Sequence, residues 1–216
     1  MTPPAPAERT RACGRMTRAL GRARAVIRDA ERVDHAVYGA IAATPSPALD
    51  AGLRRLSRAA DRSMLWAGIA AGLAAFGGPA GRRAARDGLA SIAATSAVVN
   101  GILKPAHRRR RPDATATRAT PGRAVRMPGS TSFPSGHSAS AFAFAAAAGA
   151  ELPAIALPLR ALAATVAYSR VHGGAHYPAD AVAGSLVGAA TATAVVRALG
   201  GRPAWAPAAR RFIPSG

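Results

Sequence analysis

The chain has 216 residues, half of them hydrophobic and 5% aromatic, and a formal net charge of +19. This length favours a single domain, and the abundance of Ala and Gly is typical of closely packed helices. The basic charge is not accompanied by a nucleic-acid-reading module or by stacking aromatics along a basic face, so we expect no nucleic-acid partner. The single cysteine excludes an intramolecular disulfide.

The N-terminal segment is predicted to lie outside the membrane core. Residues 1–15 are rich in Pro, Ala and Arg and are expected to form a disordered basic tail. Residues 16–62 are expected to form two amphipathic helices, over 16–43 and 48–61, which lie on the membrane interface. Charged residues, Asp34 among them, are assigned to the solvated face. The apolar faces are assigned to Val33, Val37, Tyr38 and Ile41 in the first helix and to Leu49, Leu53 and Leu56 in the second.

Residues 63–200 contain a series of apolar stretches that lack the polar stripe of a water-facing helix. A membrane span needs about 20 apolar residues, so several stretches are marginal singly. Together they predict an all-α membrane bundle of about five spans, with a soluble Ala-rich bundle as the alternative. Arginines flank the stretches, which indicates contact with anionic lipids. The predicted spans are 63–76, 86–103, 135–149, 153–168 and 178–199, and a C-terminal tail follows over 201–216.

Three short motifs follow one another between residues 104 and 180. Lys104, the only lysine of the chain, is followed by six residues and Arg111-Pro112. The second motif is Pro134-Ser135-Gly136-His137, and the third joins Ser169-Arg170 to His176 and Asp180 at intervals of five and three residues. The motifs lie at the ends of the second and fourth spans and at the starts of the third and fifth. If successive spans alternate in direction, all three motifs lie on one side of the membrane.

This set of motifs resembles that of the type 2 phosphatidic acid phosphatase (PAP2) superfamily, and no motif residue is substituted. The family includes bacterial membrane lipid phosphatases, and it shares its site with class A acid phosphatases and vanadium haloperoxidases. The resemblance implies a PAP2/haloperoxidase-like helical core in the cell membrane. It also implies hydrolysis of a lipid phosphate monoester or pyrophosphate, polyprenyl-linked or phosphatidate-type, through a phosphohistidine intermediate.

The residue types fit phosphoryl transfer independently of the resemblance. Lys104, Arg111 and Arg170 can neutralise the phosphate oxygens. Ser135 and Gly136 precede a predicted helix, whose free backbone N–H groups favour an anion. With these groups present we expect no metal and no cofactor.

His176 is the predicted nucleophile, because Asp180 is close enough in sequence to accept a hydrogen bond from one ring nitrogen and leave the other free. His137 resembles the general acid of the family, which protonates the leaving alcohol and then activates water. His107 and His172 are left outside the chemistry, and the arginines at 108–110 are expected to contact lipid headgroups or to set the membrane topology.

Two other functions are kept open. A vanadium-haloperoxidase-like enzyme would use the same residues, and a basic membrane adaptor would use none of them for chemistry. The positive-inside rule places the site at the cytoplasmic face if only two spans precede Lys104, and at the exterior if residues 33–49 also cross the membrane. The lipid substrate and the oligomeric state are not predicted.

Overall fold

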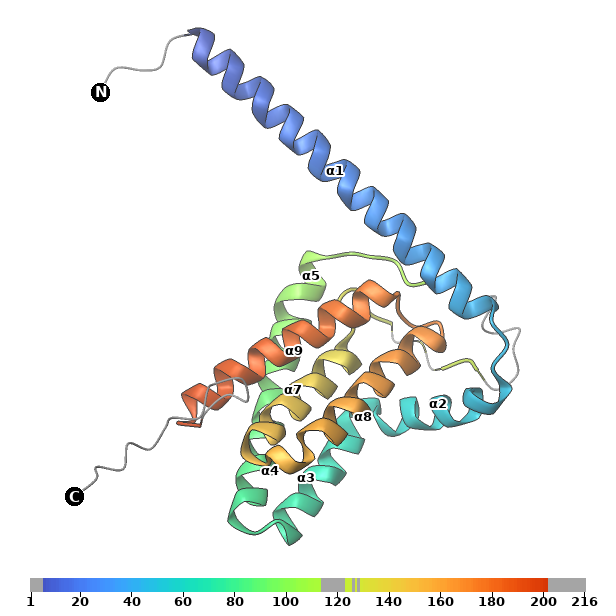
Figure 1. Ribbon diagram of the computed structural model, residues 1–216, viewed down its shortest axis with the longest axis vertical. Coiled ribbons are helices and arrows are strands. Elements are labelled where there is room, and N and C mark those ends of the chain that lie inside the picture. The colour runs from blue at the N-terminus through green and yellow to red at the C-terminus, as the bar shows by residue number, and fades with distance from the viewer. Residues whose placement is uncertain (1–5, 114–122, 126, 128, 202–216) are drawn as a thin grey trace, which may run out of the picture.

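In the computed structural model the chain is built of helices (Figure 1). The structure describes residues 6–113, 123–125, 127 and 129–201, and no strand occurs among them. The predicted all-α class is therefore confirmed. The elements are α1 (Pro6–Ala43), α2 (Pro47–Ala59), η1 (Asp61–Ser63), α3 (Met64–Phe76), α4 (Gly78–Val98), the π-helical turn η2 (Val99–Leu103), α5 (Lys104–Ala106), α7 (Gly136–Glu151), α8 (Pro153–His172) and α9 (Pro178–Ala198).

The first helix is longer than the sequence predicted. It begins at Pro6 rather than Met16, so the prediction of a disordered tail is wrong over residues 6–15, and residues 1–5 lie outside the described part. The segment is rich in Ala and Arg, which favour helix, and proline is tolerated in a first turn because its missing N–H would have no partner there. Figure 1 shows α1 leaning away from the bundle and meeting it only near its C-terminal end.

The buried faces of α1 and α2 differ from the predicted apolar faces. Tyr38 is buried as expected, but Val33 is 63% exposed, and the charged residue Asp34 is buried instead. In α2 the buried residues are Asp50, Leu53 and Ser57, so two of the three are polar. Both carboxylates are buried because they pair with cations of the second half of the chain, as described below.

α7 occupies the centre of the bundle, with α4, α8 and α9 packed around it (Figure 1). Small residues allow this close approach. A Cβ atom on Gly184 of α9 would lie 2.3 Å from the carbonyl oxygen of Ser135, and one on Gly188 would lie 2.1 Å from that of Ala139. Backbone contact between α7 and α9 therefore holds the start of α7 against the start of α9.

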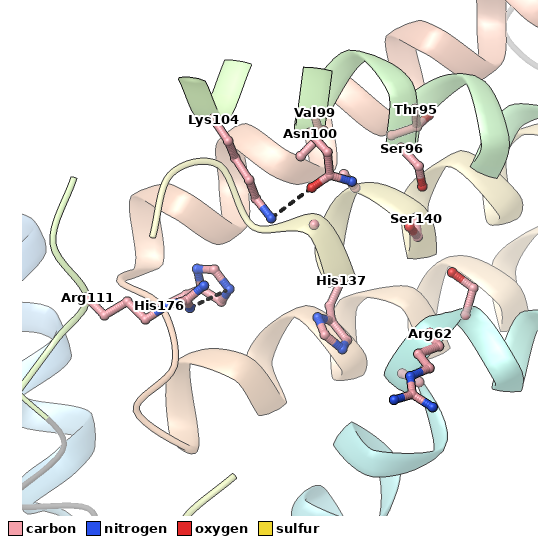
Figure 2. Close-up of a pocket in the computed structure, with 14 residues that line it drawn as sticks. Arg62, Thr95, Ser96, Val99, Asn100, Lys104, Arg111, His137, Ser140 and His176 are labelled. Carbon is pink, nitrogen blue, oxygen red and sulfur yellow. Dashed lines mark hydrogen bonds between the residues drawn. The ribbon is translucent and has the colours of Figure 1, made fainter. Parts of the chain in front are cut away.

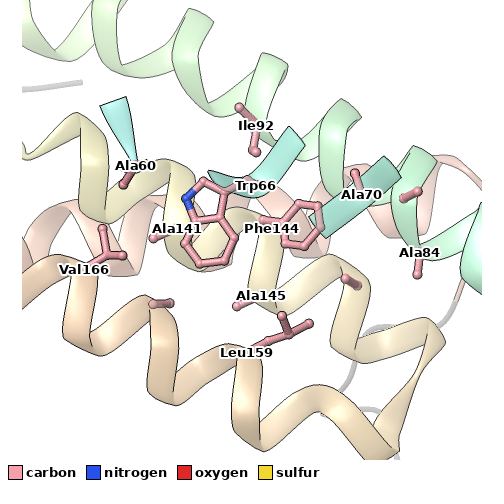
Figure 3. Close-up of a cluster of buried hydrophobic side chains, with 13 residues drawn as sticks. Ala60, Trp66, Ala70, Ala84, Ile92, Ala141, Phe144, Ala145, Leu159 and Val166 are labelled. Atoms are coloured by element: carbon pink, nitrogen blue, oxygen red, sulfur yellow. The ribbon is translucent and has the colours of Figure 1, made fainter. Parts of the chain in front are cut away.

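The apolar core lies between α3, α4, α7 and α8 (Figure 3). Trp66 and Phe144 are fully buried, and their ring centroids are 5.4 Å apart. Gly88 on α4 leaves the space that the Phe144 ring fills, since a Cβ there would be 2.6 Å from the ring. Two large aromatic residues thus fix a core that is otherwise built mainly from Ala.

Three helices of the described residues are long and apolar enough to cross a membrane: Gly78–Ala106, Pro153–His172 and Pro178–Ala198. Two other predicted spans are shorter helices, α3 with 13 residues and α7 with 16. At 1.5 Å per residue, α7 is about 24 Å long, less than the roughly 30 Å hydrocarbon core. Crossing of the membrane by α3 and α7 stays a prediction.

Candidate active site

The structure brings the three motifs together at one end of the bundle. Five of the eight predicted site residues line a single cavity of about 220 Å³: Lys104, Arg111, Gly136, His137 and His176 (Figure 2). The other three, Ser135, Arg170 and Asp180, do not line it and are almost completely buried. The cavity is therefore cationic at one end and backed by a layer of buried polar side chains.

Arg111 and His176 form the contact that sets the orientation of the histidine. Arg111 Nη1 lies 3.2 Å from His176 Nε2 and also donates to the carbonyl oxygen of Ala175 at 2.6 Å. The same guanidinium donates from Nε to the carbonyl oxygen of Ser130 at 3.0 Å. Backbone oxygens thus hold Arg111 beside Nε2 of His176, so that a phosphate group bound by the guanidinium would lie next to this nitrogen.

Asp180 lies behind His176, on the side away from Arg111. Its Oδ2 atom is 3.7 Å from His176 Nδ1, within ion-pair distance but longer than a hydrogen bond. The same oxygen accepts hydrogen bonds from Ser132 Oγ at 2.5 Å and from the backbone N–H of Tyr177 at 2.9 Å. The carboxylate is therefore fixed in place and faces Nδ1, which leaves Nε2 directed to the cavity.

Arg109 connects this carboxylate to the N-terminal helix. It donates to Asp180 Oδ1 at 2.7 Å and to Asp34 Oδ2 at 2.6 Å. Asp34 also accepts a hydrogen bond from the backbone N–H of Ala179 at 2.8 Å, in the first turn of α9. The guanidinium carbon lies 4.4 Å from the ring centroid of Tyr177. The expectation that Arg109 contacts lipid headgroups is therefore wrong, because the side chain is directed to two buried carboxylates.

The remaining predicted residues lie around the start of α7. His137 Nε2 is 2.8 Å from Asp61 Oδ1 of η1. Ser135 is the N-cap residue of α7, and its hydroxyl oxygen accepts from the Ser138 N–H at 3.4 Å. Lys104 Nζ donates to Asn100 Oδ1 at 3.0 Å. It also lies close to Gly136, since a Cβ atom added to this glycine would be 3.7 Å from Nζ. The lysine is thus directed to the N-terminal end of α7.

Arg170 lies deeper than the other two predicted phosphate-binding cations. The side chain is 1% exposed and donates from Nη1 to the hydroxyl of Ser57 in α2 at 2.5 Å. Its backbone carbonyl accepts from the N–H of Ala175 and of His176, at 2.9 and 3.2 Å. The end of α8 therefore positions His176 through main-chain hydrogen bonds.

Burial and neighbouring charges set the ionisation of the groups outside the long apolar helices. Burial lowers the pKa of the His176 imidazole to about 4, aided by the charge of Arg111 and opposed by Asp180. Burial also works to lower the pKa of Arg109, but the hydrogen bonds and charges of Asp34 and Asp180 outweigh it and raise that pKa. At neutral pH His176 is therefore uncharged, with a free lone pair on a ring nitrogen, as a nucleophile requires.

A second buried polar cluster lies beside the site. Arg123 is 1% exposed and donates to Asp50 Oδ1 at 3.1 Å and to the carbonyl oxygen of Thr44 at 2.7 Å. His172 Nε2 lies 2.7 Å from the same oxygen of Asp50. Burial works to raise the pKa of the Asp50 carboxyl, but His172 and Arg123 outweigh it and lower that pKa. The cluster fixes the turn between α1 and α2 against the segment that precedes α7.

Residues 88–203, more than half of the chain, match the family model of the PAP2 superfamily. The chain belongs to the PAP2 superfamily. Two solved structures share the PAP2 fold. The chain is 22% identical to "the first transmembrane PAP2 type phosphatidylglycerolphosphate phosphatase from Bacillus subtilis", with a TM-score of 0.60 over 80% of this chain and 87% of that one. It is 21% identical to Aquifex aeolicus LpxE, with a TM-score of 0.61 over 74% and 93%. No curated protein sequence matches the chain.

Sequence reasoning missed the acidic partners of this PAP2 site. Asp34 lies 75 residues from Arg109, and Asp61 lies 76 residues from His137, the side chains that they contact. One signal was available: a chain with only 10 acidic residues against 29 basic ones places an acidic residue in each of the segments before the first span. Among the described residues, no group of three or more His, Cys, Asp or Glu side chains could hold a metal ion.

Proposed function

We propose that this PAP2 protein is an integral-membrane phosphatase that hydrolyses a phosphate monoester or pyrophosphate of a lipid. The observation that carries the proposal is the pairing of a neutral, buried His176 with Arg111 at the wall of a cationic cavity. Three helices of membrane-spanning length support a lipid substrate. The fold shared with the Bacillus subtilis phosphatidylglycerolphosphate phosphatase supports it as well.

The substrate phosphate binds between Lys104, Arg111 and the start of α7. Lys104 and Arg111 neutralise its oxygens, and Arg170 contributes a third positive charge from behind the cavity wall. The first backbone N–H groups of α7 have no partner within the helix, so they and the positive end of its dipole add to the attraction. Charge on the phosphate is thus stabilised where it develops during transfer, and in this proposal the reaction needs no metal.

The reaction has two steps. In the first, His176 Nε2 attacks phosphorus, the bond from phosphorus to the lipid oxygen breaks, and His137 gives a proton to the departing oxygen. In the second, His137 takes a proton from water, the water oxygen attacks the phosphohistidine, and phosphate leaves with His176 restored. Asp180 stabilises the positive charge on the phosphorylated ring. Asp61, at 2.8 Å from His137, favours the protonated form that the first step requires.

The test is phosphate release by detergent-purified protein from a panel of lipids with excess chelator present. We expect activity on at least one of phosphatidate, phosphatidylglycerophosphate, polyprenyl pyrophosphate and a lipid-linked sugar phosphate, with inhibition by vanadate. His176→Ala is expected to abolish it, whereas His107→Ala, a histidine outside the cavity, is expected to retain it. Full activity of His176→Ala would overturn the mechanism. Loss of activity in chelator that returns with a divalent cation would overturn metal independence.

A further inference from the structure

The cavity extends beyond the phosphate-binding groups to a second polar end, where neutral hydroxyl groups and the exposed Arg62 lie in the lining. Thr95 and Ser96 of α4 line this part, together with Ser140 of α7, whereas Asn100 lies at the other end, where it accepts a hydrogen bond from Lys104. In the view of Figure 2, His137 is drawn between the Arg111 and His176 end and the Ser96 and Ser140 end. We call the three residues Thr95, Ser96 and Ser140 the polar subsite.

The polar subsite lies deeper in the bundle than the phosphate-binding end. Ser140 is one helical turn further along α7 than Gly136, and Ser96 is two turns before Lys104. α7 therefore runs from the phosphate end towards the polar subsite, and the α4–η2 helix runs from the polar subsite back to the phosphate end. Hydroxyl groups at membrane depth are costly unless a partner satisfies them, so their presence in a cavity indicates a ligand.

Thr95 contributes a buried hydroxyl without a partner to this lining, whereas the similar hydroxyl of Ser91, one turn earlier, lies outside the cavity. Thr95 is fully buried, and its hydroxyl has no hydrogen-bond partner among the described residues. Thr165, Thr191 and Thr193, which also lie in helices, each donate to the carbonyl four residues earlier at 2.8 to 3.0 Å. Thr95 does not satisfy its hydroxyl in this way. A buried hydroxyl without a partner costs about 1–3 kcal/mol, which a bound hydroxyl group would recover.

The position of His137 identifies which part of a substrate reaches this subsite. In the proposed reaction His137 protonates the departing oxygen, so the leaving alcohol lies beside His137. The nucleophile His176 attacks from the opposite side of the phosphorus, because the entering and leaving groups are in line. The leaving alcohol therefore extends from His137 towards Ser140 and Thr95 rather than towards His176 and Arg111.

The chemistry of the subsite suits a neutral, hydroxylated group. Among the described residues that line the cavity none is acidic, and Arg62, the one arginine or lysine of this lining beyond Lys104 and Arg111, is exposed. A second phosphate group would lack a buried cation here, and a hydrocarbon chain would leave the Thr95 hydroxyl unsatisfied. The backbone of η1 adds a fixed wall, since Arg62 and Ser63 both adopt left-handed conformations, with φ of 51° and 60°. Such strain persists where surrounding contacts impose it, often at ligand sites.

We propose that the polar subsite binds the leaving alcohol and selects lipids in which that alcohol carries a free hydroxyl group close to the phosphate ester, as glycerol and sugars do. This inference rests on the proposed phosphatase activity and adds a substrate class to it. Bare polyprenyl chains, which have no such hydroxyl, are poorer substrates.

The experiment compares phosphatidylglycerophosphate with an analogue in which 1,3-propanediol replaces the headgroup glycerol, so that only the free hydroxyl is missing. We expect kcat/KM to be about tenfold higher for the hydroxylated lipid, the effect of one neutral hydrogen bond. Thr95→Val, which keeps the side-chain volume, is expected to reduce that ratio to near one, and Ser140→Ala provides a second variant. Thr165→Val, on the exposed face of α8, is the matched control and keeps the ratio. A lipid-linked sugar phosphate and its analogue without the adjacent hydroxyl distinguish a sugar from glycerol.

Each outcome supports or overturns the inference. Equal kcat/KM for every hydroxylated lipid and its analogue overturns it and leaves the phosphatase activity standing. A preference that Thr95→Val and Ser140→Ala both retain also overturns it, because the selection then arises elsewhere. Wild-type protein that releases phosphate from no lipid overturns the proposed function and this inference with it.

Discussion

Replacing Arg109 with Met tests whether the N-terminal helix holds the Asp180 carboxylate in place. Arg109 makes two short charge-assisted hydrogen bonds, of 2.7 Å to Asp180 and 2.6 Å to Asp34. Both carboxylates are buried, with exposures of 0% and 7%. Removing one partner of a buried ion pair costs about 3–5 kcal/mol. Asp180 keeps its bonds from Ser132 and the backbone of Tyr177, so we expect the lower value, about 3 kcal/mol of unfolding free energy.

The effect on catalysis follows from the orientation of His176. Without Arg109 the Asp180 carboxylate is held from one side only, and small displacements of a reacting group cost about 100-fold in rate. We therefore expect kcat to fall by about 10- to 100-fold with little change in KM, since Arg109 does not line the cavity. Arg109→Lys is expected to recover part of the loss, because an ammonium restores the charge but not the planar fork that reaches both carboxylates.

The measurements are phosphate release under saturating and subsaturating lipid, and thermal unfolding in the same detergent. Arg110→Met is the matched control: the neighbouring side chain is exposed, and its loss is expected to leave both values near wild type. Equal kcat for Arg109→Met and Arg110→Met would refute the positioning role. A rise in KM with unchanged kcat would show that Arg109 acts in substrate binding instead.

Three further predictions follow from the packing and the charges. Gly184→Ala places a Cβ 2.3 Å from a backbone carbonyl of α7, so it should destabilise the fold by several kcal/mol and lower activity, whereas Gly68→Ala, with no atom within 4 Å, should be neutral or stabilising in thermal unfolding. His176 is uncharged when folded, since its pKa falls from 6.5 to about 4, so its stabilising contribution is complete above pH 6.5 and is lost as the pH falls towards 4. The loss amounts to at most about 3 kcal/mol of unfolding free energy. The unfolding midpoints of wild type and His176→Gln should therefore converge as the pH falls from 6.5 to 4, and midpoints that change in parallel with pH would contradict the shift. Asp61→Asn should lower kcat about tenfold for lipid alcohols but not for p-nitrophenyl phosphate, whose leaving group needs no proton from His137; equal losses would contradict the role of Asp61.

Motif spacing predicted that the site residues lie together because it reports on helix ends, and five of them line one cavity in the structure. Lys104, His137 and His176 each lie where an apolar run meets polar sequence, and helices of alternating direction bring such boundaries together. Proline and glycine at the boundaries also placed the starts of α8 and α9 correctly, at Pro153 and Pro178.

The partners of the site could not be read in the same way. Arg109 lies in a run of four consecutive arginines, and in a segment without periodicity nothing local indicates which one turns inward. Its burial depends on the path of the loop and on Asp34, which sequence periodicity assigns to a solvated face. The interval between Asp34 and Arg109 includes α2, η1, α3 and α4, so the pairing is a property of the tertiary fold alone.

The three carboxylates at Asp34, Asp50 and Asp61 also bear on where this protein can be divided. All of them precede residue 88, where the match to the PAP2 family model begins. Asp34 contacts Arg109. Asp50 contacts Arg123 and His172, and Asp61 contacts His137. A chain trimmed to the family boundaries would retain every motif and lose every one of these counter-charges. The transferable unit for grafting this site onto another membrane protein therefore begins before Asp34, and moving the motif-bearing helices of this chain into a relative should fail unless the segment that carries these three carboxylates moves with them.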